Sequence, residues 1–520
     1  MDKKNLKNAW TPDLANGMFK NPIIFADYSD PDIIRIKDNF YLVSSSFCHT
    51  PALPILHSKD LVNWEIVNYV FERFNLSGYD LVQHGKGVWA PSIRHHNGKF
   101  WVFFATPDEG IFMCTADDPL GKWSAPHMVK QAKGWIDPCP FWDENGQAYL
   151  IHAFAFSRSG IKHKLKLCRM APDGSRLLDE GNIIFDGTEH HPTIEGPKMY
   201  KRNGYYYIFA PAGGVPTGWQ TVLRSKSIYG PYEDKIVLHQ GNTRINGPHQ
   251  GGWVETESGE SWFVHFQDQG AYGRIVHLQP MRWENDWPII GVNIDKKGIG
   301  EPVLIHEKPM IRTQSNISVP ATTDDFTHNQ LGLQWQWQAN PQRTWYSLEE
   351  NPGHMRLYAR PLPQDTSGTL FDAPNLLMQK FPAPTFEVTT KLSFKLFNEG
   401  EKVGLMVFGE EYAFLSIYKS QHIWKLSQFV GKSSEAIRQE DEIEGINVEN
   451  QPVFLRVRVA SEGICVFSYS LNGTDFLVIG DNFKALPGRW VGAKVGIFAS
   501  ATVTKEIVGF ADFEFFHVTP

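Results

Sequence analysis

Three acidic side chains recur at one place in a repeated sequence pattern. The copies of the pattern begin at Asp30, Ala90, Asp137, Glu195 and Pro248, at intervals of 47 to 60 residues. In each copy a short extended run leads through a turn into an aromatic-rich strand. The position holds Asp, Ala, Asp, Glu and, in the fifth copy, Pro or the following His. Because a turn-forming role would serve all five copies alike, we predict that the three acids do chemistry.

Carboxylates that face one cavity repel each other, so their pKa values separate and the groups take different roles. Cleavage of a glycosidic bond needs such a division, because an acid must protonate the leaving oxygen while a carboxylate activates water or attacks the sugar. Glu195 is the predicted general acid, since its extra methylene extends its reach and Ile194 keeps its surroundings apolar. We predict Asp30 as the general base on the opposite side of the sugar, and Asp137 as the modulator of the acid's pKa.

The elements that position these acids are predicted to be the blades of a β-propeller. Segments such as FWVFFA and YYYIFA are short, aromatic and bounded by Gly, Pro, Asn and Asp, which is the pattern of an all-β chain. Repeats of about 50 residues with a few strands each are typical of propeller blades. Equivalent positions of successive blades surround one axis, so the three acids should converge.

The length of 520 residues predicts more than one domain. We expect a five-bladed catalytic propeller at residues 1–312, a linker at 313–323 and a β-sandwich accessory domain at 324–520. The linker is polar and contains Pro, and the strands after it alternate polar and apolar residues, with a hairpin turn at Asn472-Gly473. Because the linker is short and not Gly/Ser-rich, the sandwich should pack on the propeller, with a loop near Ala499 to Phe510 shaping the pocket.

Composition excludes several classes of function. The net charge is −7 without a basic run, which disfavours a nucleic-acid partner. No apolar run approaches 18 residues, so no membrane span is expected. The five cysteines form no CxxC pair, which argues against a disulfide framework or a structural zinc site. The first residues lack the apolar stretch of a secretory signal. A cytoplasmic protein is therefore expected, or a secreted one if a signal has been removed.

Several motifs together resemble a known family. They are DYSDPDIIRIKDNFYLVSSSF, GVWAPSIRHHNGKFWVFFA, GWIDPCPFWDENGQAYLIHAF, TIEGPKMYKRNGYYYIFAPAGG and NGPHQGGWVETESGESWFVHFQDQGAYGRIVHLQPMRW. Over essentially the whole chain they resemble glycoside hydrolase family 43, in its β-xylosidase and α-L-arabinofuranosidase members with a C-terminal concanavalin A-like sandwich (a jelly roll). The resemblance implies an inverting mechanism with Asp30 as base, Glu195 as acid and Asp137 as pKa modulator. Lys198 is a departure, since many relatives have a smaller or aromatic-compatible residue there.

The resemblance extends to further site residues. Arg274 resembles the arginine that binds sugar hydroxyls in the terminal subsite. His249 stands where the acid stands in the fourth copy, so it should also face the cavity. Trp89 and Phe47 are expected to line the pocket, with core packing as the alternative. His265 is either a satisfied core histidine or, as the resemblance implies, the holder of an axial calcium ion or water cluster. Calcium prefers oxygen ligands, so waters would supply most of that coordination.

The expected function is an exo-acting inverting glycosidase without a required cofactor. It would release terminal β-D-xylose, α-L-arabinofuranose or both from xylo-oligosaccharides or arabinoxylan fragments. An arabinofuranosidase alone is one alternative. A sucrose- or fructan-cleaving propeller is another, but Ser29-Asp30-Pro31-Asp32 and Glu195-Gly196 do not match its motifs. A non-catalytic carbohydrate-binding propeller would not need three mutually repelling acids. The sugar preference and the oligomeric state are left open, with a homo-oligomer among the options.

Overall fold

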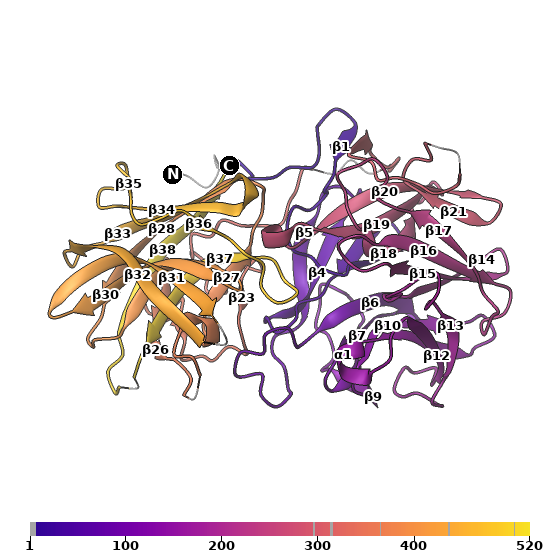
Figure 1. The fold of residues 1–520 in the computed structure, drawn as a ribbon, viewed down its shortest axis with the longest axis horizontal. Coiled ribbons are helices and arrows are strands. Elements are labelled where there is room, and N and C mark those ends of the chain that lie inside the picture. Colours follow the sequence, from indigo (N-terminus) through magenta and orange to yellow (C-terminus); the bar gives the residue numbers. More distant parts are fainter. Residues whose placement is uncertain (1–6, 295–296, 313–315, 365, 435–436, 504) are drawn as a thin grey trace.

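The computed structural model describes residues 7–294, 297–312, 316–364, 366–434, 437–503 and 505–520. The chain forms a five-bladed β-propeller and a β-sandwich that lie side by side (Figure 1). This confirms the predicted fold class. Residues 313–315 of the predicted linker lie outside the described residues. The helices are short: α1 (Phe156–Ser159), η2 (Gly270–Tyr272), η3 (Leu370–Asp372) and η4 (Ser461–Gly463). Within the described ranges, no helix is long and apolar enough to cross a membrane.

Each blade is an antiparallel sheet of four strands that follow one another in the chain. The first strands of neighbouring blades pack together around the propeller axis. In chain order the blades are β2 (Asp32–Ile36), β3 (Asn39–Val43), β4 (Ala52–Ser58), β5 (Glu65–Phe71); β6 (Trp89–His96), β7 (Lys99–Thr106), β8 (Gly110–Ala116), β9 (His127–Gln131); β10 (Trp135–Trp142), β11 (Ala148–Phe154), β12 (Lys164–Met170), β13 (Asn182–Asp186); β14 (Lys198–Arg202), β15 (Tyr205–Ala212), β16 (Trp219–Ser225), β17 (Glu233–Leu238); and β18 (His249–Glu255), β19 (Ser261–Asp268), β20 (Arg274–Glu284), β21 (Trp287–Ile290).

The turn chemistry explains why these segments form hairpins. Asn97-Gly98 joins β6 to β7 with φ values of 50° and 73°, and Asn203-Gly204 joins β14 to β15 with 50° and 76°. Positive φ at both central residues is the type I′ geometry that matches the twist of paired strands, and Asn-Gly adopts it at little cost. The second strands are then buried from both sides by neighbouring blades. In β7, every residue after Lys99 is buried.

Each blade begins with one residue in the left-handed backbone region. These residues are Asp30 (φ 54°), Ala90 (24°), Asp137 (57°), Gly196 (58°) and Gln250 (37°). In the first four blades a proline follows directly. The structure therefore corrects the sequence alignment by one residue. Gly196 and Gln250, rather than the residues before them, are the counterparts of the first aspartate, so the acid of the fourth blade and the histidine of the fifth come one position earlier.

The ring of blades is closed by the segment that precedes the first blade. Strand β1 (Met18–Lys20) pairs with β22 (Ile305–Glu307), which follows the fifth blade. Asn21 donates to the carbonyl oxygens of Leu278 and Val303 at 2.8 Å each and accepts from the Leu278 N–H at 2.8 Å. Because the donor and the acceptors come from opposite ends of the propeller sequence, these bonds tie the first blade to the last.

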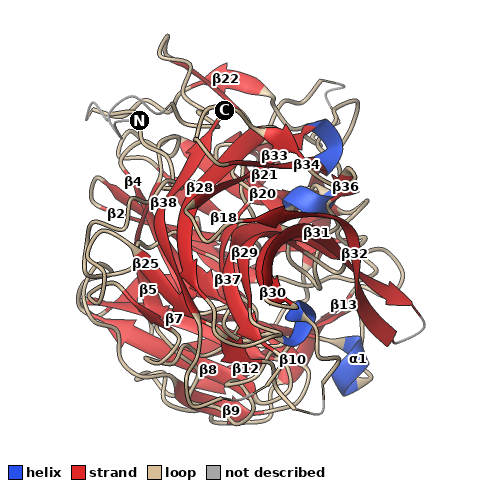
Figure 2. Cartoon of the chain, turned by 90° about the vertical axis from the view of Figure 1, so that its left-hand side faces the viewer, coloured by secondary structure: helices blue, strands red, loops and turns tan. Residues whose placement is uncertain are grey.

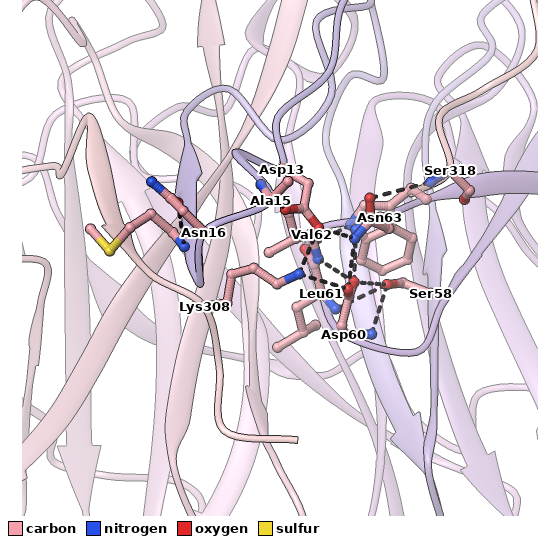
Figure 3. Close-up of polar contacts among 12 residues, drawn as sticks. Asp13, Ala15, Asn16, Ser58, Asp60, Leu61, Val62, Asn63, Lys308 and Ser318 are labelled. Carbon is pink, nitrogen blue, oxygen red and sulfur yellow. Dashed lines mark hydrogen bonds and ion pairs between the residues drawn. The ribbon is translucent and has the colours of Figure 1, made fainter. Parts of the chain in front are cut away.

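A buried polar cluster reinforces this closure (Figure 3). The carboxylate of Asp13 accepts hydrogen bonds from Asn63 at 2.9 Å and from the ammonium group of Lys308 at 2.6 Å. Asn63 also donates to Asp60 at 2.7 Å and accepts from the backbone N–H of Ser318 at 3.3 Å. The cluster thus joins the N-terminal segment, the first blade and the segment that leads into the sandwich.

The sandwich consists of two eight-stranded sheets. Figure 2 views the molecule from the sandwich side, with the long hairpin β31–β32 at the edge of one sheet. One sheet contains β23 (Gln336–Trp337), β26 (Arg360–Pro361), β27 (Leu377–Lys380), β29 (Lys402–Phe408), β30 (Tyr412–Ser420), β31 (Ile423–Ser434), β32 (Ile437–Val448) and β37 (Lys494–Ala501). The other contains β24 (Tyr346–Ser347), β25 (Met355–Tyr358), β28 (Phe386–Lys395), β33 (Val453–Ala460), β34 (Ile464–Ser470), β35 (Leu477–Val478), β36 (Phe483–Lys484) and β38 (Phe510–Thr519). Alternating apolar side chains from both sheets form the core between them.

Backbone hydrogen bonds join the sandwich to the propeller. Thr50, which precedes β4, exchanges two backbone hydrogen bonds with Trp337 of β23, at 3.1 and 2.6 Å. The phenol of Tyr272, between β19 and β20, donates to the Pro384 carbonyl at 2.8 Å and accepts from the Gly463 N–H at 2.9 Å. Both tyrosine partners belong to the sandwich. The sandwich therefore packs directly against the fifth blade through this tyrosine.

Candidate active site

The three predicted acids meet at one cavity of about 130 Å³ at the end of the propeller axis where the first strands begin. Asp30 and Asp137 contribute from their left-handed backbone positions, and Glu195 from the position before Gly196. Arg274, Phe47 and Trp89 also line it, and His249 lies just behind Glu195. Residues as far apart in sequence as 30 and 274 are therefore brought together by blade symmetry.

A larger hollow of about 520 Å³ lies where the first strands of the blades end. Its charged groups already have protein partners. Arg94 contacts Asp32 at 2.6 Å, and Lys201 contacts Asp143 at 2.6 Å. Since these two pairs lie within the protein and the three acids are elsewhere, size alone does not make this hollow the reactive site.

The carboxylate of Asp30 is held by donors from three segments. Its Oδ2 accepts hydrogen bonds from the hydroxyls of Ser29 at 2.7 Å and Ser45 at 2.6 Å, and its Oδ1 lies 3.1 Å from the guanidinium of Arg274. Ser45 also accepts from the N–H of Ala90, which fixes the second blade against the first. The side chain of Asp30 is 6% exposed. This arrangement orients a buried carboxylate for proton transfer or water activation.

Asp137 and Glu195 share the opposite side of the cavity. Burial, and then the charge of Glu195, raise the pKa of Asp137 from 3.8 to about 8, although its Oδ2 accepts from the Gly196 N–H at 2.8 Å. Burial and the nearby carboxylate therefore both favour the neutral form of Asp137 in the free protein. The ammonium of Lys198 acts in the opposite direction and lowers that pKa. Lys198 is fully buried and donates to the Pro91 carbonyl at 2.9 Å and the Ser92 hydroxyl at 2.8 Å.

His249 is fully buried behind the acid. Its Nε2 lies 3.3 Å from Oε1 of Glu195, within ion-pair distance, but the alignment of the two groups is not that of a hydrogen bond. The imidazole therefore contacts Glu195 at close range and can orient it. His249 occupies the position equivalent to Glu195 in the next blade, but it contacts the acid from behind and is not among the residues that line the cavity, where it was expected.

Arg274 reaches the base from the first residue of β20. Its guanidinium donates to Ser29 at 2.6 Å and lies over the ring of Phe266, 4.9 Å from the centroid. Its backbone N–H donates to Oδ1 of Asp27 at 2.9 Å, while Oδ2 of the same carboxylate accepts from the N–H of Gly492 in the sandwich at 2.9 Å. A single buried aspartate therefore fixes the arginine and a sandwich loop together.

Aromatic rings form one wall of the cavity. The rings of Phe47 and Trp89 lie 6.3 Å apart, and Trp490 meets Trp89 edge-on at 6.2 Å. Trp490 belongs to residues 486–493 of the sandwich, so the sandwich shapes the pocket as expected. The segment that does so differs from the expected one near Ala499 to Phe510. Hydrogen bonds to the propeller, such as that from the Ala493 N–H to the Ala271 carbonyl at 2.7 Å, hold residues 486–493 at the cavity.

His265 lies apart from the residues that line the cavity. Its Nδ1 is 3.1 Å from the Phe266 carbonyl, its Nε2 is 3.1 Å from the amide nitrogen of Gln279, and its ring stacks on His277 at 5.3 Å. Burial lowers the pKa of His265 to about 4. The described residues contain no group of three or more His, Cys, Asp or Glu that could hold a metal ion. This nitrogen-rich surrounding is a poor fit to calcium, which prefers oxygen ligands.

Sequence reasoning missed several residues of this site. Ser29 and Ser45 bind the base, Gln250 lines the cavity, and Trp490 closes it. Gln250 stands in the GPHQGG motif. It could have been found by aligning the first four blades on their prolines and then matching His249-Gln250 to Glu195-Gly196. Serine gives no distinct signal, and a tryptophan in a sandwich loop can be placed only through the packing of the two domains.

Comparison with known proteins agrees with this geometry. The model of glycosyl hydrolases family 43 matches residues 19–288. This chain belongs to glycosyl hydrolase family 43. The model of the beta-xylosidase C-terminal concanavalin A-like domain matches residues 323–519, so the family assignment covers both the propeller and the sandwich.

Individual relatives share the family architecture. A putative beta-xylosidase of Xylanibacter ruminicola is 40% identical over 503 residues, covering 95% of this chain and 89% of that protein. The non-reducing end alpha-L-arabinofuranosidase BoGH43B of Bacteroides ovatus is 30% identical over 423 residues, covering 76% and 75%. Among solved structures, the GH43 protein BlXynB of Bacillus licheniformis is 26% identical with a TM-score of 0.83, covering 96% of this chain and 99% of that one.

Proposed function

We propose that this family 43 enzyme releases terminal β-D-xylose, α-L-arabinofuranose or both from xylo-oligosaccharides or arabinoxylan fragments, with inversion at the anomeric carbon. One observation carries the proposal: three carboxylates and an arginine converge on a small cavity that a sandwich loop closes on one side. A closed pocket accepts a chain end, whereas internal cleavage needs a groove open at both sides. The names of the two relatives, a beta-xylosidase and an arabinofuranosidase, support the two sugars.

Each of these residues has its own role in the reaction. Glu195 in its protonated form donates its proton to the glycosidic oxygen as the bond to the anomeric carbon breaks. Asp30 takes a proton from a water molecule, whose oxygen bonds to the anomeric carbon from the opposite face, as in inverting glycosidases. Asp137 lies beside the acid, and burial together with the proximity of the two carboxyl groups disfavours a second negative charge there, which favours a proton on the pair before the reaction. Arg274 is placed to bind sugar hydroxyls while it holds the base.

Digestion of xylotetraose labelled at its reducing end tests the exo-acting reading. The enzyme should shorten the labelled chain by one xylose at a time, so labelled xylotriose appears before labelled xylobiose. Release of labelled xylobiose and free xylobiose as first products would indicate internal cleavage and contradict the proposal. Asp30→Ala, which removes the base, serves as the inactive control.

The same assay with arabinose-substituted xylobiose decides between the two sugars. Release of arabinose alone would favour an arabinofuranosidase, and release of both sugars would show dual specificity. Binding of xylotetraose without release of any sugar would instead favour a carbohydrate-binding propeller.

A further inference from the structure

The left-handed position at the start of a blade carries a polar side chain in three of the five blades. Asp30 and Asp137 hold it in the first and third blades, and both line the cavity. Gln250 holds it in the fifth blade, with φ 37°, and lines the same cavity. The second and fourth blades have Ala90 and Gly196 there, which carry no functional group. Three blades therefore direct a polar side chain from equivalent backbone positions into one small space.

The amide of Gln250 is buried without a protein partner. The residue is 3% exposed, and its Nε2 makes no hydrogen bond to any part of the chain that the structure describes. Buried polar groups in native proteins are nearly always hydrogen-bonded, and an unpaired one in a ligand cavity calls for an explanation. A ligand in the cavity that supplies the missing partner would provide it.

The backbone around Gln250 is fixed by close packing. A Cβ on Gly251, the next residue, would lie 1.7 Å from the carbonyl oxygen of Val264 in the neighbouring strand β19. A Cβ on Gly196 would lie 2.5 Å from Cγ and 2.7 Å from Nε2 of Gln250. Gly196 directly follows the proposed acid Glu195. The absence of a side chain at Gly196 therefore leaves room for the amide beside the acid.

We propose that Gln250 binds a hydroxyl group of the terminal pentose through its side-chain amide and thereby helps to select the sugar. A carboxamide suits this role because it offers both a donor and an acceptor, as a hydroxyl does. It also adds no fourth negative charge to a cavity that already contains three acids. This inference rests on the proposed function, since it takes a pentose as the ligand.

Titration calorimetry of the full-length protein with sugars tests the contact directly. The wild type and Gln250→Met are titrated with xylose, with its 2-, 3- and 4-deoxy analogues and with arabinose. Methionine retains the approximate shape and removes the hydrogen bond. We expect Gln250→Met to bind xylose about tenfold more weakly, as for one lost hydrogen bond. One deoxy analogue should bind equally to both proteins, because it lacks the hydroxyl that the amide contacts.

A matched control is Gln220→Met. Gln220 is also buried, but its amide donates to the Thr221 carbonyl at 3.0 Å and it does not line the cavity. This variant should bind xylose within twofold of the wild type. Gln250→Glu adds a conservative test. The carboxyl group of this variant can donate a hydrogen bond to the sugar only when it is protonated. Its affinity for xylose, relative to the wild type, should be higher at pH 5 than at pH 8.

The outcomes separate this inference from the proposed function. If the wild type binds a pentose and both variants of Gln250 bind it equally well, the inference alone is wrong. If Gln250→Met weakens xylose and every deoxy analogue by one common factor, the amide contacts no hydroxyl and the inference is also wrong. If the wild type binds neither pentose, the proposed substrate class and the inference fall together.

Discussion

At the scale of single residues, the two reactive carboxyl groups differ in their surroundings. Asp30 is almost fully buried and receives two serine hydroxyls and a guanidinium group. The side chain of Glu195 is 30% exposed, and its Oε1 lies 3.3 Å from the imidazole of His249. The oriented, enclosed carboxylate suits a fixed water molecule, and the more accessible one suits a leaving oxygen that must enter and depart. This difference supports the assignment of base and acid.

A substrate with a good leaving group should restore activity to a variant that lacks the acid. The same substrate should not restore activity to a variant that lacks the base. Glu195→Gln should lower kcat/KM on xylobiose by about 10²–10⁴-fold, because general acid catalysis is lost. Its activity on an aryl xyloside with a strongly acidic phenol should fall far less, since such a phenolate leaves without protonation. Asp30→Asn should be impaired on both substrates. Steady-state kinetics of the two variants on both substrates provide the measurement, and equal rescue of both variants would refute the assignment.

The raised pKa of Asp137 predicts a pH-dependent stability. The folded pKa of about 8 lies above the ordinary value of 3.8, so the group's favourable contribution is complete below pH 3.8 and is lost as pH rises toward 8. Asp137→Asn removes this loss. The Tm of the variant minus that of the wild type should therefore increase between pH 5 and pH 8. The corresponding difference in the free energy of unfolding changes by at most about 1.4 kcal/mol per pH unit. Parallel Tm curves for the two proteins would show that Asp137 does not titrate in this range.

The reactive residues could be predicted from the sequence because their types are informative. Three acids in a repeated pattern, and an arginine in a family motif, stand out without a structure. The neutral groups around them do not. Ser45, which follows β3, contacts Asp30, which precedes β2, and serine gives no distinct signal. In the fifth blade no proline follows Gln250, so the repeat does not mark it as the counterpart of Asp30.

At the scale of elements, residues 486–493 of the sandwich act as a wall of the propeller's cavity. Trp490 has a left-handed backbone with φ 65° and faces Trp89. Two residues later, Gly492 lies against the turn that carries Arg274. A Cβ on Gly492 would lie 2.6 Å from the backbone nitrogen of Gly273 and 2.8 Å from its Cα. The position of the wall therefore depends on a close approach of two backbones.

This close approach can be tested with two substitutions in the same loop. Gly492→Ala should force the loop away from the turn and lower kcat/KM on xylobiose by about tenfold or more, because a displacement of about 1 Å in a positioning element can be costly. Gly488→Ala is the control. Its added Cβ would meet a methyl group of Val491 at 3.0 Å, which can move, and the Val491 carbonyl oxygen at 3.9 Å, which is an ordinary contact. We expect this control to stay within twofold of the wild type, and equal effects of the two substitutions would contradict the role of the contact.

Strands were easier to predict than this loop. The alternation of apolar residues and the Asn-Gly turns are local signals, so the blades and the sandwich hairpins follow from short stretches of sequence. The place of residues 486–493 depends on how two domains dock. Its hydrogen bonds join residues more than 200 positions apart, such as Ala493 with Ala271, and a single sequence contains no signal for such a pair.

At the scale of the whole molecule, the two domains share hydrogen bonds that neither could satisfy alone. Asn340 of the sandwich donates to the Phe74 carbonyl at 2.9 Å and accepts from the Phe74 N–H at 2.7 Å. The hydroxyl of Thr50 donates to the Ala339 carbonyl at 2.7 Å. These groups are buried, so separation of the domains would leave them unpaired unless water replaced their partners.

We therefore expect the propeller and the sandwich to unfold together. Differential scanning calorimetry should show one endotherm, and activity should be lost at the same temperature. Asn340→Ala, which removes both bonds to Phe74, should lower this temperature or split the transition. Two well-separated endotherms in the wild type would show instead that the domains are independently stable.

In the proposed mechanism Asp30 activates water for direct displacement, with Glu195 as the acid. A proton NMR time course of xylobiose hydrolysis tests it most directly, because the anomeric signals report which configuration appears first, before mutarotation. Inversion at the anomeric carbon requires α-xylose to appear first from the β-linked disaccharide. Early β-xylose would mean retention of configuration, and hence a covalent or otherwise two-step reaction that contradicts the roles assigned to Asp30 and Glu195.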